Sequence, residues 1–278
     1  MVNLLKMMKG RNLVNAIGIP CWLFLIWKGG LYYTIFMLIC CVLALGEFYS
    51  ILEKKGSKPL RWLGMGSSVF IADYYYVQPV LTTHQLLGII IFIVIVTSLL
   101  ELFSDNKNPS LNISSTFAGI LFVPVLLGTS IDIRQYDLMM GTNLTFALVV
   151  SVWACDSAAF IFGTSFGKKK IMPTVSPKKS WVGSISGLIA SLIVFYLFQE
   201  QGLLGSFFEQ KDAIIIGLIC GLVGQLGDFT ESMLKRDVGV KDSGALLAGH
   251  GGVLDRFDSL IFAFPSTYLY IHFFMNFN

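Results

Sequence analysis

Acidic, basic and glycine residues gather in residues 226–259 of an otherwise apolar sequence. At the start of this stretch, polar side chains recur at the spacing that places them on one face of a helix: Asp228, Glu231, Ser232 and Lys235. Carboxylates bind hard cations such as Mg²⁺, and cationic side chains balance the charge of phosphate groups. This face therefore carries the residue types of a metal-assisted phosphate-transfer site.

The second half of the stretch predicts a loop followed by another helix. Asp255 and Asp258 stand three residues apart and share one face of that helix. The loop before them combines charged residues, a histidine and glycines: Lys241, Asp242, Gly244, Gly249, His250, Gly251 and Gly252. Glycine lets backbone N–H groups approach an anion closely, so this loop is a candidate for binding phosphate.

A second polar cluster comes earlier, where Asp156 lies in a predicted apolar helix and is followed by Ser176-Pro177-Lys178-Lys179-Ser180. Asp156 lies about seven residues before that helix ends, or roughly 10 Å deep at the helical rise of 1.5 Å per residue. We expect Asp228 at a similar depth. Ionisable groups inside membrane spans are costly, and they face a cavity or each other. We therefore expect four carboxylates to converge near one plane: Asp156, Asp228, Asp255 and Asp258.

The composition excludes an ordinary soluble domain. Of the 278 residues, 55% are hydrophobic and 13% are charged, whereas about 25% of the residues in soluble domains are charged. We expect an all-α polytopic membrane protein, because helices satisfy their backbone hydrogen bonds inside a bilayer.

The net charge of +3 is too small to indicate nucleic-acid binding. The five cysteines lie in apolar runs without a Cys-x-x-Cys pair, as is typical of small buried side chains.

About nine runs are apolar enough to span a bilayer, which takes roughly 17–25 residues per helix. They cover residues 12–28, 31–52, 61–80, 85–103, 114–132, 143–163, 181–200, 212–234 and 254–275. The first five runs form an N-terminal region, residues 1–140. The remaining four form a C-terminal catalytic region, residues 141–278, with two cytoplasmic loops. Two glycine pairs predict close helix packing, Gly183-x-x-x-Gly187 and Gly217-x-x-x-Gly221.

Lys and Arg predict the orientation, because they concentrate in cytoplasmic loops. With a cytoplasmic N-terminus and nine spans, all 20 Lys and Arg residues fall on the inner side except Lys28, Arg134 and Lys211. This orientation puts the polar site at the cytoplasmic side, where nucleotides are found. The chain length and the lack of a soluble extension predict a bacterial inner (cell) membrane.

Residues 153–266 resemble a known family. The diagnostic motif of the phosphatidate cytidylyltransferase (CDP-diacylglycerol synthase) family resembles three segments here: Ser232-x-x-Lys235-Arg236, Lys241-Asp242 and His250-Gly251-Gly252-x-x-Asp255-Arg256-x-Asp258. The family also has segments similar to Asp156-Ser157-x-Ala159 and to Ser176-Pro177-Lys178-Lys179-Ser180. The sequence departs from the family pattern at three positions, with Val182 for Glu, Ala248 for Pro and Thr164 for Arg.

The resemblance implies that CTP and phosphatidate give CDP-diacylglycerol and pyrophosphate in a homodimer surrounded by membrane lipids. It implies Mg²⁺ as cofactor and leaves a second cation open. Catalysis is expected from Asp228, Asp255, Asp258 and Lys235, and the metal ligands are expected to be Asp156 and the same three aspartates. The expected substrate and phosphate ligands are Ser176, Lys178, Lys179, Ser232, Arg236, Lys241, Asp242, His250, Gly251, Gly252 and Arg256.

Other interpretations stay open on the sequence alone. A related CTP-dependent cytidylyltransferase would use a different lipid phosphate as acceptor. An ion-coupled transporter also places acids inside spans, although its site is expected at the membrane midplane and between inverted repeats. The acids could instead form structural ion pairs with Lys235, Arg236 or Arg256. Glu47, near the inner end of the second run, has no assigned role.

Overall fold

The computed structural model describes residues 16–77, 83–137, 139–206, 208–246 and 251–275. Every named element in these ranges is helical, and their sole extended pairing is an isolated bridge between Lys170 and Ser180. The all-α prediction is therefore confirmed for the described residues. The chain divides into two compact units, Met1–Asp132 with Val238–Arg256 and Ile133–Asp237 with Phe257–Asn278.

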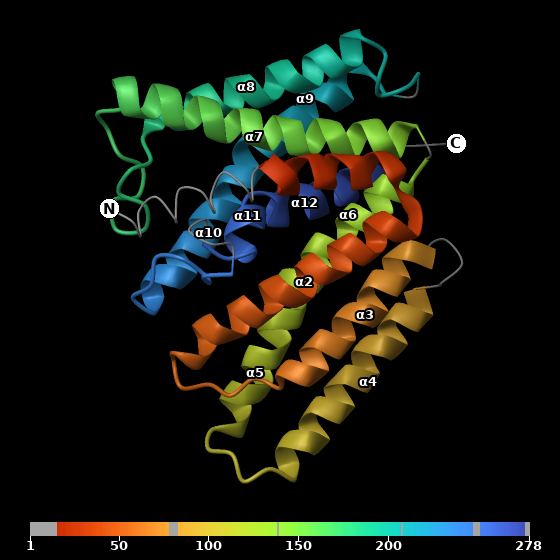
Figure 1. The fold of residues 1–278 in the computed structure, drawn as a ribbon, viewed down its shortest axis with the longest axis vertical. Coiled ribbons are helices and arrows are strands. Elements are labelled where there is room, and N and C mark those ends of the chain that lie inside the picture. The colour runs from red at the N-terminus through yellow and green to blue at the C-terminus, as the bar shows by residue number, and fades with distance from the viewer. Residues whose placement is uncertain (1–15, 78–82, 138, 207, 247–250, 276–278) are drawn as a thin grey trace. The chain divides into compact units, whose positions relative to one another are not determined.

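The first unit is a helical assembly (Figure 1). Its elements are the helix Ala16–Lys28, α2 (Gly30–Glu53), α3 (Arg61–Val77), α4 (Thr83–Leu102), α5 (Pro109–Ile120), η1 (Leu121–Val125) and the start of α6 (Leu126–Gln135). α2 packs against α3, α5 and η1, while α4 packs against α3 and α5. The loop of residues 238–253, between α10 and α11, belongs to this unit by its packing although it is distant in sequence.

Tyr49 of α2 packs against α3 and α5 in the first unit. Its hydroxyl donates a hydrogen bond of 2.9 Å to the backbone carbonyl of Thr116 in α5. Gly64 of α3 and Gly119 of α5 leave room for the Tyr49 ring, because a Cβ at either position would overlap it. The buried ring thus holds three helices together, and it fixes the part of α2 that carries Glu47.

The second unit carries most of the candidate site residues. Its elements are the end of α6, α7 (Met140–Phe166), α8 (Trp181–Glu200), α9 (Gln210–Leu218), η2 (Ile219–Val223), α10 (Gly224–Asp237) and α12 (Leu260–Phe274). α7 lies along α8, α8 lies along α9 and η2, and α10 packs against α12 (Figure 1). The short helix α11 (Leu254–Phe257) falls at the division between the units.

The predicted close packing at both glycine pairs is confirmed. A Cβ on Gly183 would lie 2.6 Å from the carbonyl oxygen of Ala159, and one on Gly187 would lie 2.8 Å from that of Cys155. A Cβ on Gly217 or Gly221 would press on the α8 backbone in the same way. Small residues let helices in membranes approach backbone to backbone, so α8 is fixed between α7 and the helix α9–η2–α10.

Proline explains the irregular turn η1 in the long helix Pro109–Gln135. Pro124 lacks the N–H that a regular helix donates, and its ring crowds the carbonyl one turn earlier. A π-helical turn widens the helix at such a point and lets the chain continue. Pro109–Gln135 therefore remains one continuous helix, long enough to span a membrane.

Five helices are long and apolar enough to cross a membrane: Gly30–Glu53, Pro109–Gln135, Met140–Phe166, Trp181–Glu200 and Gln210–Asp237. Three shorter apolar helices, Ala16–Lys28, Leu87–Leu102 and Leu260–Phe274, fall within other predicted runs. The remaining predicted run, 61–80, contains α3. The protein is thus an all-helical membrane protein, while the count of nine spans and the cytoplasmic N-terminus stay predictions.

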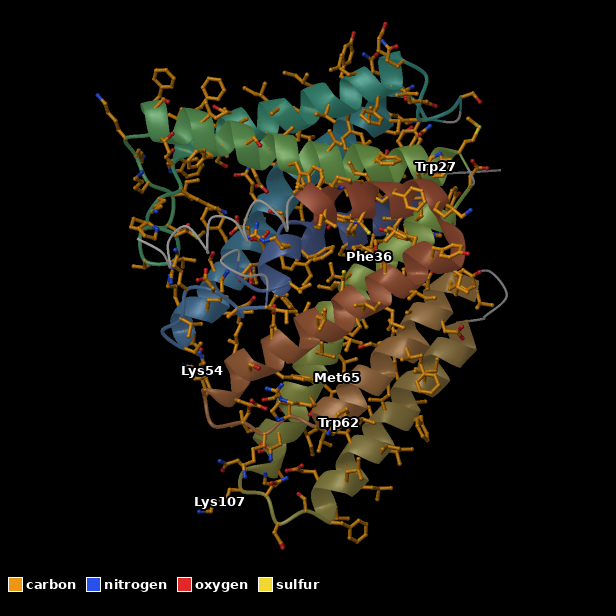
Figure 2. The ribbon with its side chains drawn as sticks, viewed as in Figure 1. Trp27, Phe36, Lys54, Trp62, Met65 and Lys107 are labelled. Carbon is orange, nitrogen blue, oxygen red and sulfur yellow. The ribbon has the colours of Figure 1, made fainter. Side chains whose placement is uncertain are left out.

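The surface of the first unit fits a lipid environment. Trp27 and Trp62 are 63% and 88% exposed, as side chains at a membrane boundary are. Figure 2 shows Lys54 and Lys107 toward one end of this unit and Trp27 toward the other. The two lysines belong to segments that the charge pattern assigns to the same side of the membrane, so their placement agrees with that pattern within this unit.

Candidate active site

A cleft in the second unit collects predicted site residues from two helices, α7 and α10, and from the segment between α7 and α8. It holds about 220 Å³ and is lined by α7, α8, α10 and the segment between α7 and α8. Four of its lining residues carry charges that the sequence assigned to metal or substrate binding: Asp156, Lys178, Lys179 and Asp228. Two carboxylates and two ammonium groups thus face one cleft, which is the charge arrangement expected for a metal–phosphate complex.

Asp228 lies at the centre of the polar contacts in this cleft. Its carboxylate forms an ion pair with the ammonium group of Lys179. The hydroxyl of Ser232, one turn later on α10, donates to Asp228 Oδ1 at 3.3 Å. Lys179 Nζ also lies 4.3 Å from the centre of the Phe229 ring, within the range of a cation–π interaction. α10 therefore holds Lys179 through an acid and an aromatic ring on adjacent residues.

The segment between α7 and α8 folds back on itself and presents Lys178 and Lys179 to the cleft. The backbone N–H of Trp181 donates to Lys169 O at 3.1 Å, and that of Ile171 donates to Lys179 O at 3.3 Å. Ser180 ends the segment and caps α8, because its Oγ accepts from Gly183 N at 3.3 Å. This local pairing explains why Lys179 points into the cleft and not along the segment.

Ser176 and Lys178 occupy the turn of the same segment. The carbonyl of Ser176 accepts from Lys179 N at 3.3 Å, which closes the turn. Lys178 is exposed and lines the cleft. The backbone of Ser176 thus shapes the turn that carries both lysines, whereas its predicted contact with substrate stays a prediction.

The remaining polar residues of α10 are already engaged. Lys235 Nζ lies 3.1 Å from Glu231 Oε2 in a buried i,i+4 ion pair. Arg236 is exposed, and its Nε donates to the carbonyl of Val175 at 3.4 Å, which ties the end of α10 to the lysine segment. Glu231 is therefore the partner of Lys235, and the catalytic role expected of Lys235 stays a prediction.

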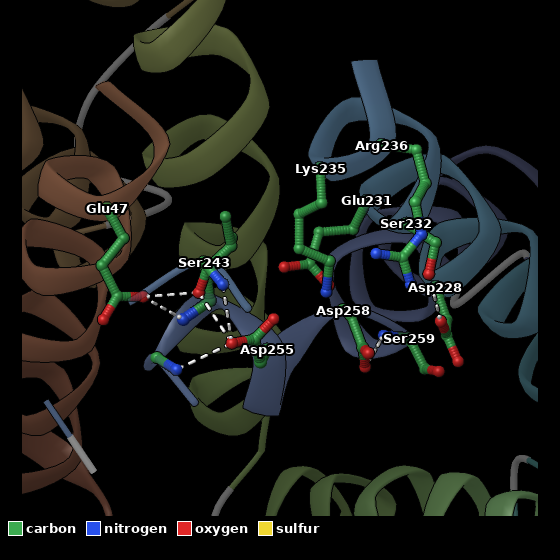
Figure 3. Close-up of polar contacts among 12 residues, drawn as sticks. Glu47, Asp228, Glu231, Ser232, Lys235, Arg236, Ser243, Asp255, Asp258 and Ser259 are labelled. Carbon is green, nitrogen blue, oxygen red and sulfur yellow. Dashed lines mark hydrogen bonds and ion pairs between the residues drawn. The ribbon is translucent and has the colours of Figure 1, made fainter. Parts of the chain in front are cut away.

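Asp258 is the third of the predicted metal-binding aspartates that lie in the second unit, after Asp156 and Asp228. Its Oδ1 accepts a hydrogen bond of 2.7 Å from Ser259 N (Figure 3). Its charge interacts with those of Asp228, Glu231 and Asp156, so these side chains lie within electrostatic reach of each other. Like charges gathered in a membrane protein repel each other, and a bound cation relieves that repulsion.

Asp255 belongs to the first unit, where it organises a loop. Its Oδ2 accepts from Ser243 N at 2.9 Å, Ser243 Oγ at 3.0 Å and Gly252 N at 2.7 Å (Figure 3). Gly251 adopts a φ of +79°, in the left-handed region that glycine tolerates. The Asp255 carboxylate thus joins the two ends of the loop, and its expected metal-binding role stays a prediction.

The other predicted phosphate ligands of the first unit are either exposed or outside the described residues. Lys241, Asp242 and Arg256 are exposed. His250 and Gly249 lie outside the residues that the structure describes. The phosphate-binding roles expected of this loop therefore stay predictions.

The donor chemistry of the cleft fits Mg²⁺ bound together with phosphate groups. Within the described residues, no three His, Cys, Asp or Glu side chains are placed to hold a metal among themselves. Magnesium, however, is often held by one or two carboxylates, with waters and substrate phosphates as the other ligands. Asp156 and Asp228 supply such a pair of carboxylates in one cleft.

The sequence analysis missed two residues that line this cleft, Gln225 and Ser184. Ser184 Oγ donates to Gln225 Oε1 at 2.6 Å, and Gln225 Nε2 donates back to Ser184 O at 3.1 Å. These bonds connect α8 to α10 beside Asp228. Gln225 could have been noticed from the sequence, because it is a glutamine within an apolar run. A buried amide in a membrane helix requires a hydrogen-bond partner.

The comparisons with known proteins match nearly the whole chain. The cytidylyltransferase family matches residues 9–274. A phosphatidate cytidylyltransferase of Synechocystis sp. is 31% identical in an alignment of 291 positions that covers 95% of this chain and 97% of that relative. One of Staphylococcus aureus (strain COL) is 34% identical over 263 residues, 93% and 96% of the two chains. One of Haemophilus influenzae is 41% identical over 174 residues, 61% of this chain and 60% of that relative.

Proposed function

Because the chain belongs to the cytidylyltransferase family, we infer that it transfers the cytidylyl group of CTP to phosphatidate, giving CDP-diacylglycerol and pyrophosphate. The observation that supports a site for this reaction is the cleft that Asp156, Lys178, Lys179 and Asp228 line together. The protein is thus a nucleotidyltransferase of phospholipid biosynthesis. Membership of this family argues against the ion-coupled transporter.

The reaction requires two anions to meet. A phosphate oxygen of phosphatidate attacks the α-phosphorus of CTP, a new P–O bond forms, and the bond to the β-phosphate breaks as pyrophosphate leaves. Neutralising charge is therefore the main task of the site. Lys178 and Lys179 bring positive charge to the cleft, and Asp156 and Asp228 supply oxygen ligands for Mg²⁺. When bound, Mg²⁺ stabilises negative charge on the phosphate oxygens.

Lys179 and Asp228 are paired before substrate arrives. The pair keeps both side chains aimed at the cleft, because each restricts the rotamers of the other. On substrate binding, a phosphate group replaces Asp228 as the partner of Lys179, which frees the carboxylate for a cation. The Phe229 ring stays beneath the ammonium group and limits its movement during this exchange.

The finer assignments belong to the same proposal. The family resemblance assigns metal binding to Asp156, Asp228, Asp255 and Asp258, and catalysis to Lys235. The phosphate ligands are those the motif assigns in the loop and helices: Ser232, Arg236, Lys241, Asp242, His250, Gly251, Gly252 and Arg256. The protein forms a homodimer in the bacterial inner membrane, with nine spans, a cytoplasmic N-terminus and the site facing the cytoplasm.

Pyrophosphate release by the purified protein in detergent tests this function. Release is expected only when CTP, phosphatidate and Mg²⁺ are all present, and the lipid product should be CDP-diacylglycerol. Omitting each component in turn, or chelating the metal thoroughly, should abolish release. Release that survives chelation would refute the metal requirement, and release with another lipid phosphate but not with phosphatidate would refute the acceptor.

A further inference from the structure

Glu47 is an acid in the interior of an apolar helix, and all its hydrogen bonds described here run to a distant loop. Its Oε1 accepts from the backbone N–H of Val253 at 3.0 Å. Its Oε2 accepts from the backbone N–H of Leu254 at 2.9 Å and from Ser243 Oγ at 3.0 Å. Figure 3 shows the carboxylate aimed from α2 at this loop. One side chain thus binds residues 243 and 253–254, on both arms of the loop.

Two glycines make room for this carboxylate. A Cβ on Gly244 would overlap the Glu47 carboxylate from one arm of the loop, and a Cβ on Gly252 would overlap it from the other. The loop glycines were predicted to let backbone approach an anion. The anion that Gly244 and Gly252 approach in this unit is the chain's own Glu47 carboxylate. Any larger side chain at either position would separate the loop from α2.

Ser243 connects Glu47 to Asp255. Its hydroxyl lies 3.0 Å from both Glu47 Oε2 and Asp255 Oδ2. A hydroxyl has one hydrogen to donate, so the two carboxylates share a single donor and the remaining bonds come from backbone N–H groups. The Asp255 carboxylate also accepts from Gly252 N at 2.7 Å, next to the residues that Glu47 holds. The orientation of Asp255 therefore depends on the same backbone that Glu47 fixes.

We propose that Glu47 is a positioning residue for the cytidylyl transfer inferred above, acting through the loop and Ser243 on Asp255. A carboxylate inside an apolar membrane helix is costly, so three well-formed hydrogen bonds to one loop indicate a specific task. Glu47 touches no substrate in this account. It holds the backbone of residues 251–254 in the arrangement that orients the Asp255 side chain, which the motif assigns to catalysis.

Glu47→Gln tests this role with minimal change of shape. The amide keeps one acceptor oxygen but turns an NH₂ group toward a backbone N–H donor, so one bond to Val253 or Leu254 is lost. We expect the turnover number to fall roughly 10–100-fold, the usual effect of removing a group that orients a functional side chain. The Michaelis constant for CTP should change much less. Glu53→Gln is the matched control, because Glu53 lies on the same helix, exposed, and pairs with Arg61.

Hydrogen exchange separates positioning from a general loss of stability. In Glu47→Gln, the amides of residues 251–256 should exchange faster than in the wild type, whereas those of α7 and α8 should not change. Combining Glu47→Gln with Asp255→Asn should cost less than the product of the two separate losses, because both act through one loop. Glu47→Asp, which keeps the charge on a shorter side chain, should recover part of the turnover.

Each outcome has a distinct meaning. If the wild-type protein releases no pyrophosphate, the proposed reaction is wrong. The hydrogen-exchange measurement still tests the contact between Glu47 and the loop in that case. Wild-type turnover in Glu47→Gln, or unchanged exchange of residues 251–256, overturns the positioning role. If Glu47→Gln does not fold, Ser243→Ala tests the same role, because it removes the hydroxyl that links the carboxylates of Glu47 and Asp255. Full turnover in that variant contradicts the proposal.

Discussion

Replacing Asp228 by Asn is expected to lower the turnover number roughly 10²–10³-fold, the loss that follows removal of one charge-stabilising group from an active site. Asn preserves the size of the side chain and can still accept from Ser232. It removes the negative charge that pairs with Lys179 and that the proposal assigns to a divalent cation. Pyrophosphate release at saturating CTP and phosphatidate measures the effect.

The control for this variant is another Asp→Asn replacement in the same chain. Asp105 is exposed in the segment between α4 and α5 of the first unit, outside the candidate site. Asp105→Asn should turn over as the wild type does, and both variants should elute as the wild type does on size exclusion. An Asp228→Asn protein that is folded and fully active would contradict the assignment of Asp228 to the site.

Replacing Lys179 by Met should reduce turnover by about 10²-fold and raise the Michaelis constant for CTP. Met keeps most of the length of lysine and can still pack on the Phe229 ring, so the change isolates the loss of the ammonium group. Without that charge, the cleft has less positive potential to receive the triphosphate. Initial rates over a range of CTP concentrations separate the two effects.

Lys168→Met provides the matched control for Lys179→Met. Lys168 is exposed at the start of the same segment and lies outside the cleft lining described above. Its replacement should leave both kinetic constants unchanged. The double variant Asp228→Asn/Lys179→Met should lose less than the product of the single losses, because the two side chains are in contact. Strictly multiplicative losses would show that the two residues act independently.

The depth of two acids in apolar runs made the approach of Asp156 and Asp228 predictable. Asp156 and Asp228 sit at similar depths in apolar runs, and a buried acid requires a cavity or a partner, so their convergence followed from general rules. The substrate-binding role of Lys179 was predicted from the short segment Ser176-Pro177-Lys178-Lys179-Ser180. In the structure these three side chains line one cleft. The glycine pairs likewise predicted the close approach of α8 to its neighbours, which the contacts confirm.

The role of the loop in the first unit was not predictable in the same way. Its contacts join Ser243, Val253 and Leu254 to Glu47, about 200 positions earlier, and no periodic pattern links segments so far apart. Residues 226–259 form one continuous polar stretch in the sequence. In the structure, Val238–Arg256 packs within the first unit, and the residues on either side belong to the second unit. Asp255 and Asp258 share a predicted helix face, yet each makes its own hydrogen bonds within a different unit.

Equilibrium binding of CTP to the purified protein without phosphatidate tests the central claim most directly, because it asks whether the cleft of Asp156, Asp228 and Lys179 is the nucleotide site. Binding should require Mg²⁺, and Asp228→Asn should weaken it by at least about tenfold, or ~1.4 kcal/mol. Lys168→Met should bind as the wild type does. Equal affinities of wild type and Asp228→Asn for CTP, or binding that ignores Mg²⁺, would contradict the account.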